Sequence, residues 1–131
     1  MNGPWTFDQA MSACRQASMA QRAAEDAMRE ASIDFAKAEE AYRLALAAEI
    51  VRQHGEFSVA WTATADLARG NPNVARLRRE RDIAEGVREA MQQAAWRRAA
   101  DRKDAQRFAD WSQRRELAEN GGPDSRLGLA A

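Results

Sequence analysis

An alanine recurs at every seventh position through the first third of the chain, and this regularity restricts the possible folds more than any other sequence feature. The repeat comprises Ala10, Ala17, Ala24, Ala31, Ala38 and Ala45. The alternating column holds Phe7, Cys14, Gln21, Met28, Phe35 and Tyr42. Strict seven-residue spacing is typical of two helices that wind around each other, and small side chains let them approach closely. We therefore expect a long helix that packs against an antiparallel partner helix.

The boundaries of this first helix follow from the residues that flank it. Thr6 followed by Gln9 has the form of a capping box, in which each side chain satisfies a backbone donor at a helix start. No glycine or proline interrupts residues 7–54, and Gly55 offers the left-handed conformation that ends many helices. We predict a helix over about residues 7–54.

A short second helix is expected over about residues 58–69. One helical face of this region carries several apolar or small residues, namely Phe57, Ala60, Trp61, Thr64 and Ala68. The pair Arg69-Gly70 suits a helix stop. The end of the first helix is apolar nearly all round, at Leu44, Leu46, Ile50 and Val51. Because such a segment requires cover on more than one side, we expect the short helix to provide it.

A second long helix is predicted over about residues 73–119. The segment Asn71-Pro72-Asn73 supplies caps and a proline suited to a first helical turn. The chain then runs to Glu119 before Asn120-Gly121-Gly122-Pro123, which predicts the helix end. The fold class we predict is all-α: a long antiparallel helical hairpin with a coiled-coil-like, alanine-rich seam and a short third helix at the bend. Residues 1–119 form a single hairpin domain in this prediction, and residues 120–131 form a flexible C-terminal tail.

The predicted second long helix carries a basic stripe bracketed by tryptophans, in a chain whose formal net charge is zero. The residues of this stripe, which we call the basic face, are Trp96, Lys103, Arg107, Trp111 and Arg114. At 100° per residue they fall on one side of the helix, and Arg78 returns to the same line. The opposite side, with Phe108 at its edge, is expected to form the core; it holds Val87, Met91, Ala94, Ala105 and Ala109.

Three interpretations of the basic face stay open. It is a solvated surface if Asp101, Asp104 and Asp110 pair with their basic neighbours at three- or four-residue spacing. It is a protein contact if the exposed tryptophans meet a partner. It binds nucleic acid if arginines neutralise phosphates while tryptophans stack on unpaired bases. Residues 74–119 hold twelve basic and nine acidic residues, a smaller basic excess than a dedicated duplex binder usually shows.

Catalytic groups are scarce in this sequence. His54 and Cys14 are the only histidine and the only cysteine, too few for a zinc cluster or for a Cys/His nucleophile pair. We expect His54 to interact with the carbonyl end of the first helix and Cys14 to be a small core residue. Phosphate-binding glycine loops and nucleophile-elbow motifs are absent. We therefore expect no enzyme, no cofactor and no metal site.

The start of the chain has neither a secretory signal nor a membrane span, and its single cysteine fits a reducing compartment, so we expect a cytoplasmic protein of a bacterial host cell.

The stretch RERDIAEGVREAMQQAAWRRAADRKDAQRFADWSQRRELAE, residues 79–119, resembles segments of small all-helical proteins encoded by bacteriophages and prophages of GC-rich hosts. The resemblance implies an accessory protein that acts on a host or phage component. We expect a non-enzymatic module that binds a protein partner and can form homo-oligomers. The alternative is a nucleic-acid-binding accessory protein that uses the basic face.

Overall fold

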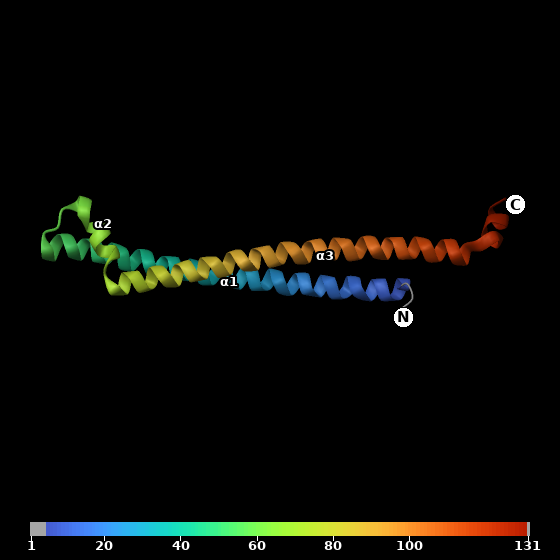
Figure 1. Cartoon of the computed structure of the whole chain (residues 1–131), viewed down its shortest axis with the longest axis horizontal. Helices are drawn as coiled ribbons and strands as arrows, with labels where there is room; N and C mark the ends of the chain where they lie inside the picture. The colour runs from blue at the N-terminus through green and yellow to red at the C-terminus, as the bar shows by residue number, and fades with distance from the viewer. Residues whose placement is uncertain (1–4, 131) are drawn as a thin grey trace. The chain divides into compact units, whose positions relative to one another are not determined.

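A computed structural model of the protein contains three helices and their connections. It describes the backbone of residues 5–130 and the side chains of residues 5–121. Helix α1 spans Phe7–Phe57, α2 spans Trp61–Arg69 and α3 spans Pro72–Ala130 (Figure 1). No strand occurs in residues 5–130. The predicted all-α class is confirmed.

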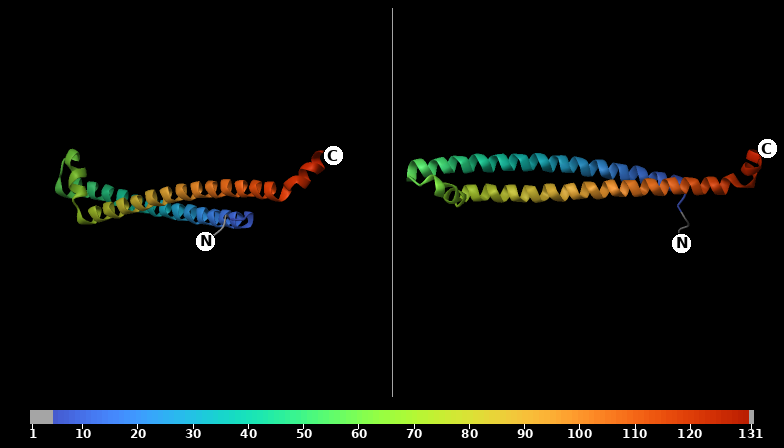
Figure 2. Two further views of the ribbon diagram at one scale, coloured as in Figure 1. Left: turned by 45° about the vertical axis from the view of Figure 1, so that its right-hand side comes forward. Right: turned by 90° about the horizontal axis from the view of Figure 1, so that it is seen from above.

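The chain divides into two compact units, Met1–Glu25 with Ala94–Ala131 and Asp26–Gln93. Within each unit a segment of α1 lies against a segment of α3 that runs in the opposite direction, as Figures 1 and 2 show for the blue and orange segments of the first unit. The second unit also contains α2, which connects the end of α1 to the start of α3. The helical hairpin is confirmed, and the single domain stays a prediction.

The capping box at the start of α1 is confirmed. The Thr6 backbone N–H donates to Gln9 Oε1 over 2.9 Å, and the Gln9 backbone N–H donates to Thr6 Oγ1 over 3.2 Å. These two bonds satisfy donors that a helix start leaves without partners. The capping box therefore fixes the first turn of α1.

The end of α1 lies later than the sequence suggested. Gly55 is helical, and the helix continues to Phe57. Ser58 instead adopts the left-handed conformation, with a φ of 54°. After this turn the Val59 backbone N–H donates to the Gln53 carbonyl over 3.3 Å. The predicted stop at Gly55 was wrong because glycine permits a left-handed turn but does not impose one.

Helix α2 begins at Trp61 rather than at residue 58, because residues 58–60 form the turn out of α1. It ends at Arg69, as predicted. Its packed face is narrower than expected: Thr64 and Ala68 are buried, whereas Trp61 is exposed. The other two residues of the predicted face, Phe57 and Ala60, are also exposed.

The start of α3 agrees with its predicted cap. Asn71 Oδ1 accepts bonds from the backbone N–H groups of Asn73 at 2.9 Å and Val74 at 3.3 Å. Pro72 occupies the first helical position, where its missing N–H costs no hydrogen bond. The cap residue and the proline together therefore begin α3 one residue before the predicted start.

Helix α3 does not end at Glu119 as predicted, and the proposed tail of residues 120–131 is helical through Ala130. Glycine tolerates helical geometry, and Pro123 removes only one backbone donor from the helix, so neither residue type forbids continuation. Figure 1 shows the red end of α3 changing direction, which is the usual effect of a proline inside a helix. Residue 131 lies outside the described residues.

The alanine column faces the partner helix in both units. Ala10 and Ala31 are buried, and Ala17, Ala24, Ala38 and Ala45 are half-buried. In the first unit Ala10 and Cys14 form a buried cluster with Ala109 of α3. Because these side chains are small, the two backbones approach closely there.

Arginines occupy the same seam in the second unit. The Arg81 guanidinium carbon lies 4.6 Å from the Tyr42 ring centre, and that of Arg88 lies 4.6 Å from the Phe35 ring centre. The seven-residue step from Phe35 to Tyr42 in α1 therefore matches the seven-residue step from Arg88 back to Arg81 in α3. Arginines were predicted only on solvent-facing surfaces, so this pairing, in which the arginine stems lie on aromatic rings, was not expected.

Glu49 is a buried acidic residue in the second unit. Arg52 donates hydrogen bonds to both of its carboxylate oxygens, and Gln53 Nε2 donates another over 2.9 Å. The Arg52 bonds first, and the Gln53 bond second, lower the pKa of Glu49 from 4.5 to about 2. The same pair raises the pKa of Arg52, chiefly through the hydrogen bond to Glu49. Glu49 therefore stays ionised in the folded protein under mildly acidic conditions.

Three further apolar residues that were expected to be covered are exposed. Leu44 and Val51 face solvent, so α2 does not provide the predicted cover for them. Val87 is also exposed, whereas Met91, Ala94, Ala105 and Ala109 of the predicted core side are buried or half-buried. Val87 directly precedes the seam residue Arg88, and one residue turns the side chain by about 100° around a helix. It therefore lies on a flank of the second unit.

Candidate protein-interaction site

All five residues of the basic face lie on α3 in the first unit, and all are exposed. Trp96 is the more exposed of the two tryptophans, with 65% of its surface accessible to solvent. Some of the expected pairs form: Arg107 lies 3.9 Å from Asp104, and Arg98 lies 3.7 Å from Asp101. Asp110 instead accepts a hydrogen bond from Gln106. The solvated interpretation thus accounts for part of this surface.

Trp111 belongs to a different group of side chains. Its ring centre lies 5.7 Å from that of Phe108, and Phe108 lies 5.7 Å from Trp5 in an edge-to-face arrangement. We call Trp5, Phe108 and Trp111 the aromatic cluster. Trp96 lies fifteen residues before Trp111, about 22 Å along an α-helix at 1.5 Å per residue. The two tryptophans that bracket the basic run therefore do not act as one pair.

Polar contacts hold the aromatic cluster in place. Arg115 Nη2 donates to the Trp5 carbonyl over 2.8 Å, and the Arg115 guanidinium carbon lies 4.9 Å from the Trp111 ring centre. Beside it, the Phe7 backbone N–H donates to Glu116 Oε1 over 2.8 Å. Trp5 thus stands next to the capping box and is tied to α3 before α1 begins.

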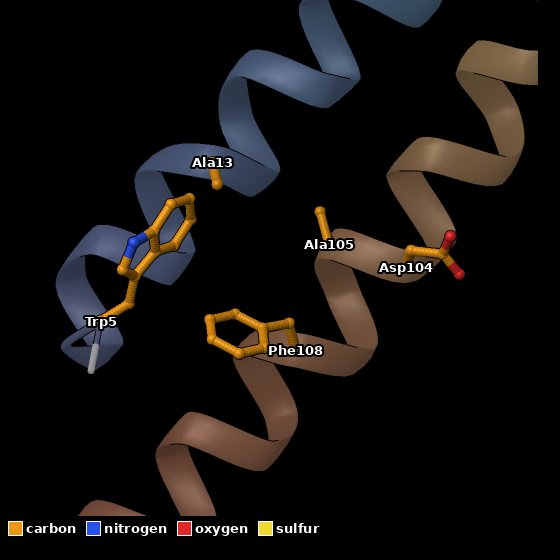
Figure 3. Close-up of a pocket in the computed structure, with 5 residues that line it drawn as sticks. All are labelled: Trp5, Ala13, Asp104, Ala105 and Phe108. Carbon is orange, nitrogen blue, oxygen red and sulfur yellow. The ribbon is translucent and has the colours of Figure 1, made fainter. Parts of the chain in front are cut away.

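An open apolar pocket of about 420 Å³ lies beside the cluster. Its lining residues are Trp5, Ala13, Asp104, Ala105 and Phe108 (Figure 3). Trp5 and Ala13 come from the start of the chain and face Ala105 and Phe108 of α3, whereas the Asp104 carboxylate points away from the space between them. The two alanines leave room that larger side chains would fill. The open side of the pocket therefore presents aromatic and methyl surface.

The lining of this pocket is apolar apart from one carboxylate. Its one ionisable residue, Asp104, is engaged with Arg107 and has no neighbouring nucleophile among the lining residues. Within residues 5–121, no three histidine, cysteine or acidic side chains come together as metal ligands. Apolar lining with aromatic edges instead suits the side chain of another molecule.

His54 is used structurally at the end of α1, in the second unit. Its Nδ1–H donates to the Val59 carbonyl over 2.9 Å, and its ring stacks on Trp61 with the ring centres 3.7 Å apart. The predicted helix-end position of His54 is confirmed, although it contacts the turn that follows the helix. These two contacts connect the last turn of α1 to the first turn of α2.

Trp5, Ala13 and Phe108 were not predicted as site residues from the sequence. Ala13 belongs to a second seven-residue column with Ala20 and Ala27, which neighbours the one that was noticed. That column signals an apolar flank on α1 beside the seam. The meeting of Trp5 with Phe108 joins residues more than a hundred positions apart, and no local pattern reports such a contact.

Comparison with known proteins gave no match to any family model, curated protein or solved structure. Among the described residues, no helix combines the length and apolar character needed to cross a membrane. The candidate site therefore rests on the geometry of the first unit.

Proposed function

We propose that this protein is a non-enzymatic interaction module and that the aromatic cluster and its pocket bind a helix of a protein partner. The observation that carries the proposal is the partial exposure of the aromatic cluster: Trp5 and Trp111 expose 48% and 49% of their surface beside an apolar pocket. Covering the exposed half of one tryptophan contributes about 2–3 kcal/mol at roughly 25 cal/mol per Å². Anchors of this kind dominate binding at protein interfaces.

The shape of the site favours a helical partner. The pocket lies between two antiparallel helix segments, with Ala13 on one side and Ala105 and Phe108, about one helical turn apart, on the other. An amphipathic helix fits such a groove by inserting one apolar side chain and packing its neighbours on the rims. We propose that this side chain is a branched aliphatic or aromatic one, because the lining offers little polar surface for hydrogen bonding.

The resemblance of residues 79–119 to phage-encoded proteins supports a partner from the bacterial host or from a phage. In this proposal the protein acts as an accessory factor or as an inhibitor of a host protein, and it has no catalytic role. The coiled-coil-like seam joins the two helix segments of one chain and leaves the pocket free for the partner. If the partner is a second copy of this chain, the same pocket would form a homo-oligomer.

The test uses two matched substitutions in α1 of the first unit. Ala13→Glu places a carboxylate in the pocket, and Ala23→Glu makes the same change at an exposed alanine outside it. A partner isolated from the native host is titrated against both variants and the wild type by isothermal titration calorimetry. We expect A13E to weaken binding by at least about tenfold, because an unpaired charge is costly in an apolar contact, and A23E to bind like the wild type. Equal binding by all three proteins would contradict the proposal.

A second candidate function is single-stranded nucleic-acid binding by the basic face. It is favoured by the open indole of Trp96 and by the Arg107 side chain, which is 82% exposed despite its contact with Asp104. This candidate predicts a salt-sensitive mobility shift with single-stranded DNA that is lost in the double variant Arg107→Glu, Arg114→Glu. Absence of a shift at low ionic strength would exclude it.

A further inference from the structure

An open surface pocket lies in the second unit, between the end of α2 and the first turns of α3. Its volume is about 400 Å³. We call it the arginine cleft; its lining residues are Arg69, Ala75, Arg78, Arg79, Asp82 and Ile83. On α3 these positions follow one another at three- and four-residue spacing, so they form one face opposite Arg69. None of them lines the aromatic pocket, and none is among the five residues that define the basic face, although Arg78 falls on the same line of α3.

The charges in this cleft are unbalanced. Asp82 already accepts two hydrogen bonds from Arg81, at 2.8 and 3.1 Å, so its charge is neutralised from outside the cleft. Arg69 makes one exposed pair with Asp66 at 3.1 Å. Arg78 and Arg79 make no ion pair or side-chain hydrogen bond with any residue in the described part of the chain. Three arginines thus line the cleft together with one carboxylate, Asp82, which is already paired with Arg81.

We infer that the arginine cleft binds the phosphate group of a small phosphate monoester. Guanidinium groups bind phosphate oxygens in a bidentate manner, and several of them together favour a dianionic terminal phosphate over a singly charged phosphodiester.

The cleft has an apolar wall for the organic part of the ligand. Ile83 exposes 62% of its surface, and with Ala75 it forms the portion of the lining that carries no charge. A free phosphate ion would leave this wall in water. A phosphate that bears a planar or apolar body covers it and gains the corresponding hydrophobic contribution.

The test follows the arginine Nε–H resonances by nuclear magnetic resonance at low ionic strength. The probes are adenosine monophosphate, inorganic phosphate, adenosine and a short oligonucleotide with 5′- and 3′-hydroxyl ends. We expect saturable shifts of Arg69, Arg78 and Arg79 with the nucleotide at about millimolar concentration, weaker binding of inorganic phosphate, and no shift with adenosine.

Three variants complete the test. The double variant Arg78→Gln, Arg79→Gln is expected to weaken nucleotide binding by about tenfold or more, and Ile83→Ser should weaken binding of the nucleotide but leave that of inorganic phosphate unchanged. Arg22→Gln, at an exposed arginine of the first unit, is the control and should bind like the wild type. Both arginines of the double variant are exposed, so circular dichroism should show an unchanged fold.

Three results would overturn the inference: no saturable shift, equal shifts of all exposed arginines including Arg22, or equal binding of the oligonucleotide without a terminal phosphate. Equal affinity for nucleotide and inorganic phosphate would overturn the assignment of the apolar wall. The experiment involves no residue of the aromatic pocket, so its failure is separate from a failure of the proposed function.

Discussion

Ser58 ends α1 in a backbone conformation that serine seldom adopts. At its φ of 54° the Cβ atom lies too close to the following carbonyl, a strain that glycine avoids. We predict that Ser58→Gly stabilises the protein by about 1 kcal/mol in urea unfolding, whereas Ser58→Val destabilises it, since a β-branched residue tolerates this region least. If both variants unfold at the urea concentration of the wild type, the left-handed turn does not terminate α1 in solution.

Glu49, which lies on α1 nine residues before Ser58, makes the free energy of unfolding depend on pH. Because its pKa is lowered from 4.5 to about 2 in the folded state, its contribution is fully present above pH 4.5 and is lost as the pH falls toward 2. We expect the melting temperature of the wild type to fall more between pH 4.5 and pH 2 than the melting temperature of the Glu49→Gln variant does. The control Glu40→Gln, at an exposed glutamate of α1, should retain the pH dependence of the wild type. An equally steep loss in Glu49→Gln would contradict the assignment.

At the scale of elements, the arginines of α3 decide how the seam of the second unit is packed. Arg88 stacks on Phe35, but its Nε atom is buried without a hydrogen-bond partner. The stacking contributes about 0.5–1 kcal/mol, whereas an unsatisfied buried donor costs about 1–3 kcal/mol.

We therefore predict that Arg88→Met, which keeps the length of the stem and removes the donor, raises the free energy of unfolding by about 1 kcal/mol in urea titration. The matched variant Arg81→Met should lower it, because Arg81 donates two hydrogen bonds to Asp82 and those bonds would be lost. Destabilisation by both substitutions to the same extent would show that the stacking outweighs the buried donor.

Elements were predictable wherever the determining residues are close in the sequence. The capping box of Thr6 and Gln9, the Asn71 cap and the alanine column each report on one turn or on one face of a helix, and all three occur in the structure. The end of α1 and the packed face of α2 depend on how the turn at residues 58–60 folds back, which no periodic pattern encodes. The packing of Arg81 and Arg88 in the seam was not predicted, because charged residues were assigned to solvent. The stems of these two side chains pack on aromatic rings.

At the scale of the molecule, the sequence correctly indicated an exposed aromatic and basic region on α3. It wrongly assigned both tryptophans of that region to one surface. Trp96, Lys103, Arg107, Trp111 and Arg114 are exposed as expected, yet Trp111 packs with Phe108 in the aromatic cluster. The partner of Phe108 is Trp5, brought there by the pairing of the first turns of α1 with a distant part of α3. Only the folded chain identifies that pocket, because helical periodicity describes one helix at a time.

The four tryptophans allow the central claim to be tested in one experiment, since Trp5 and Trp111 lie in the aromatic cluster and Trp61 and Trp96 lie outside it. The protein is labelled with 5-fluorotryptophan, the resonances are assigned by substitution, and fluorine spectra are recorded with and without the purified partner. Binding at the aromatic pocket predicts that the Trp5 and Trp111 resonances shift while those of Trp61 and Trp96 stay in place. A saturated complex in which Trp5 and Trp111 are unchanged would contradict the claim.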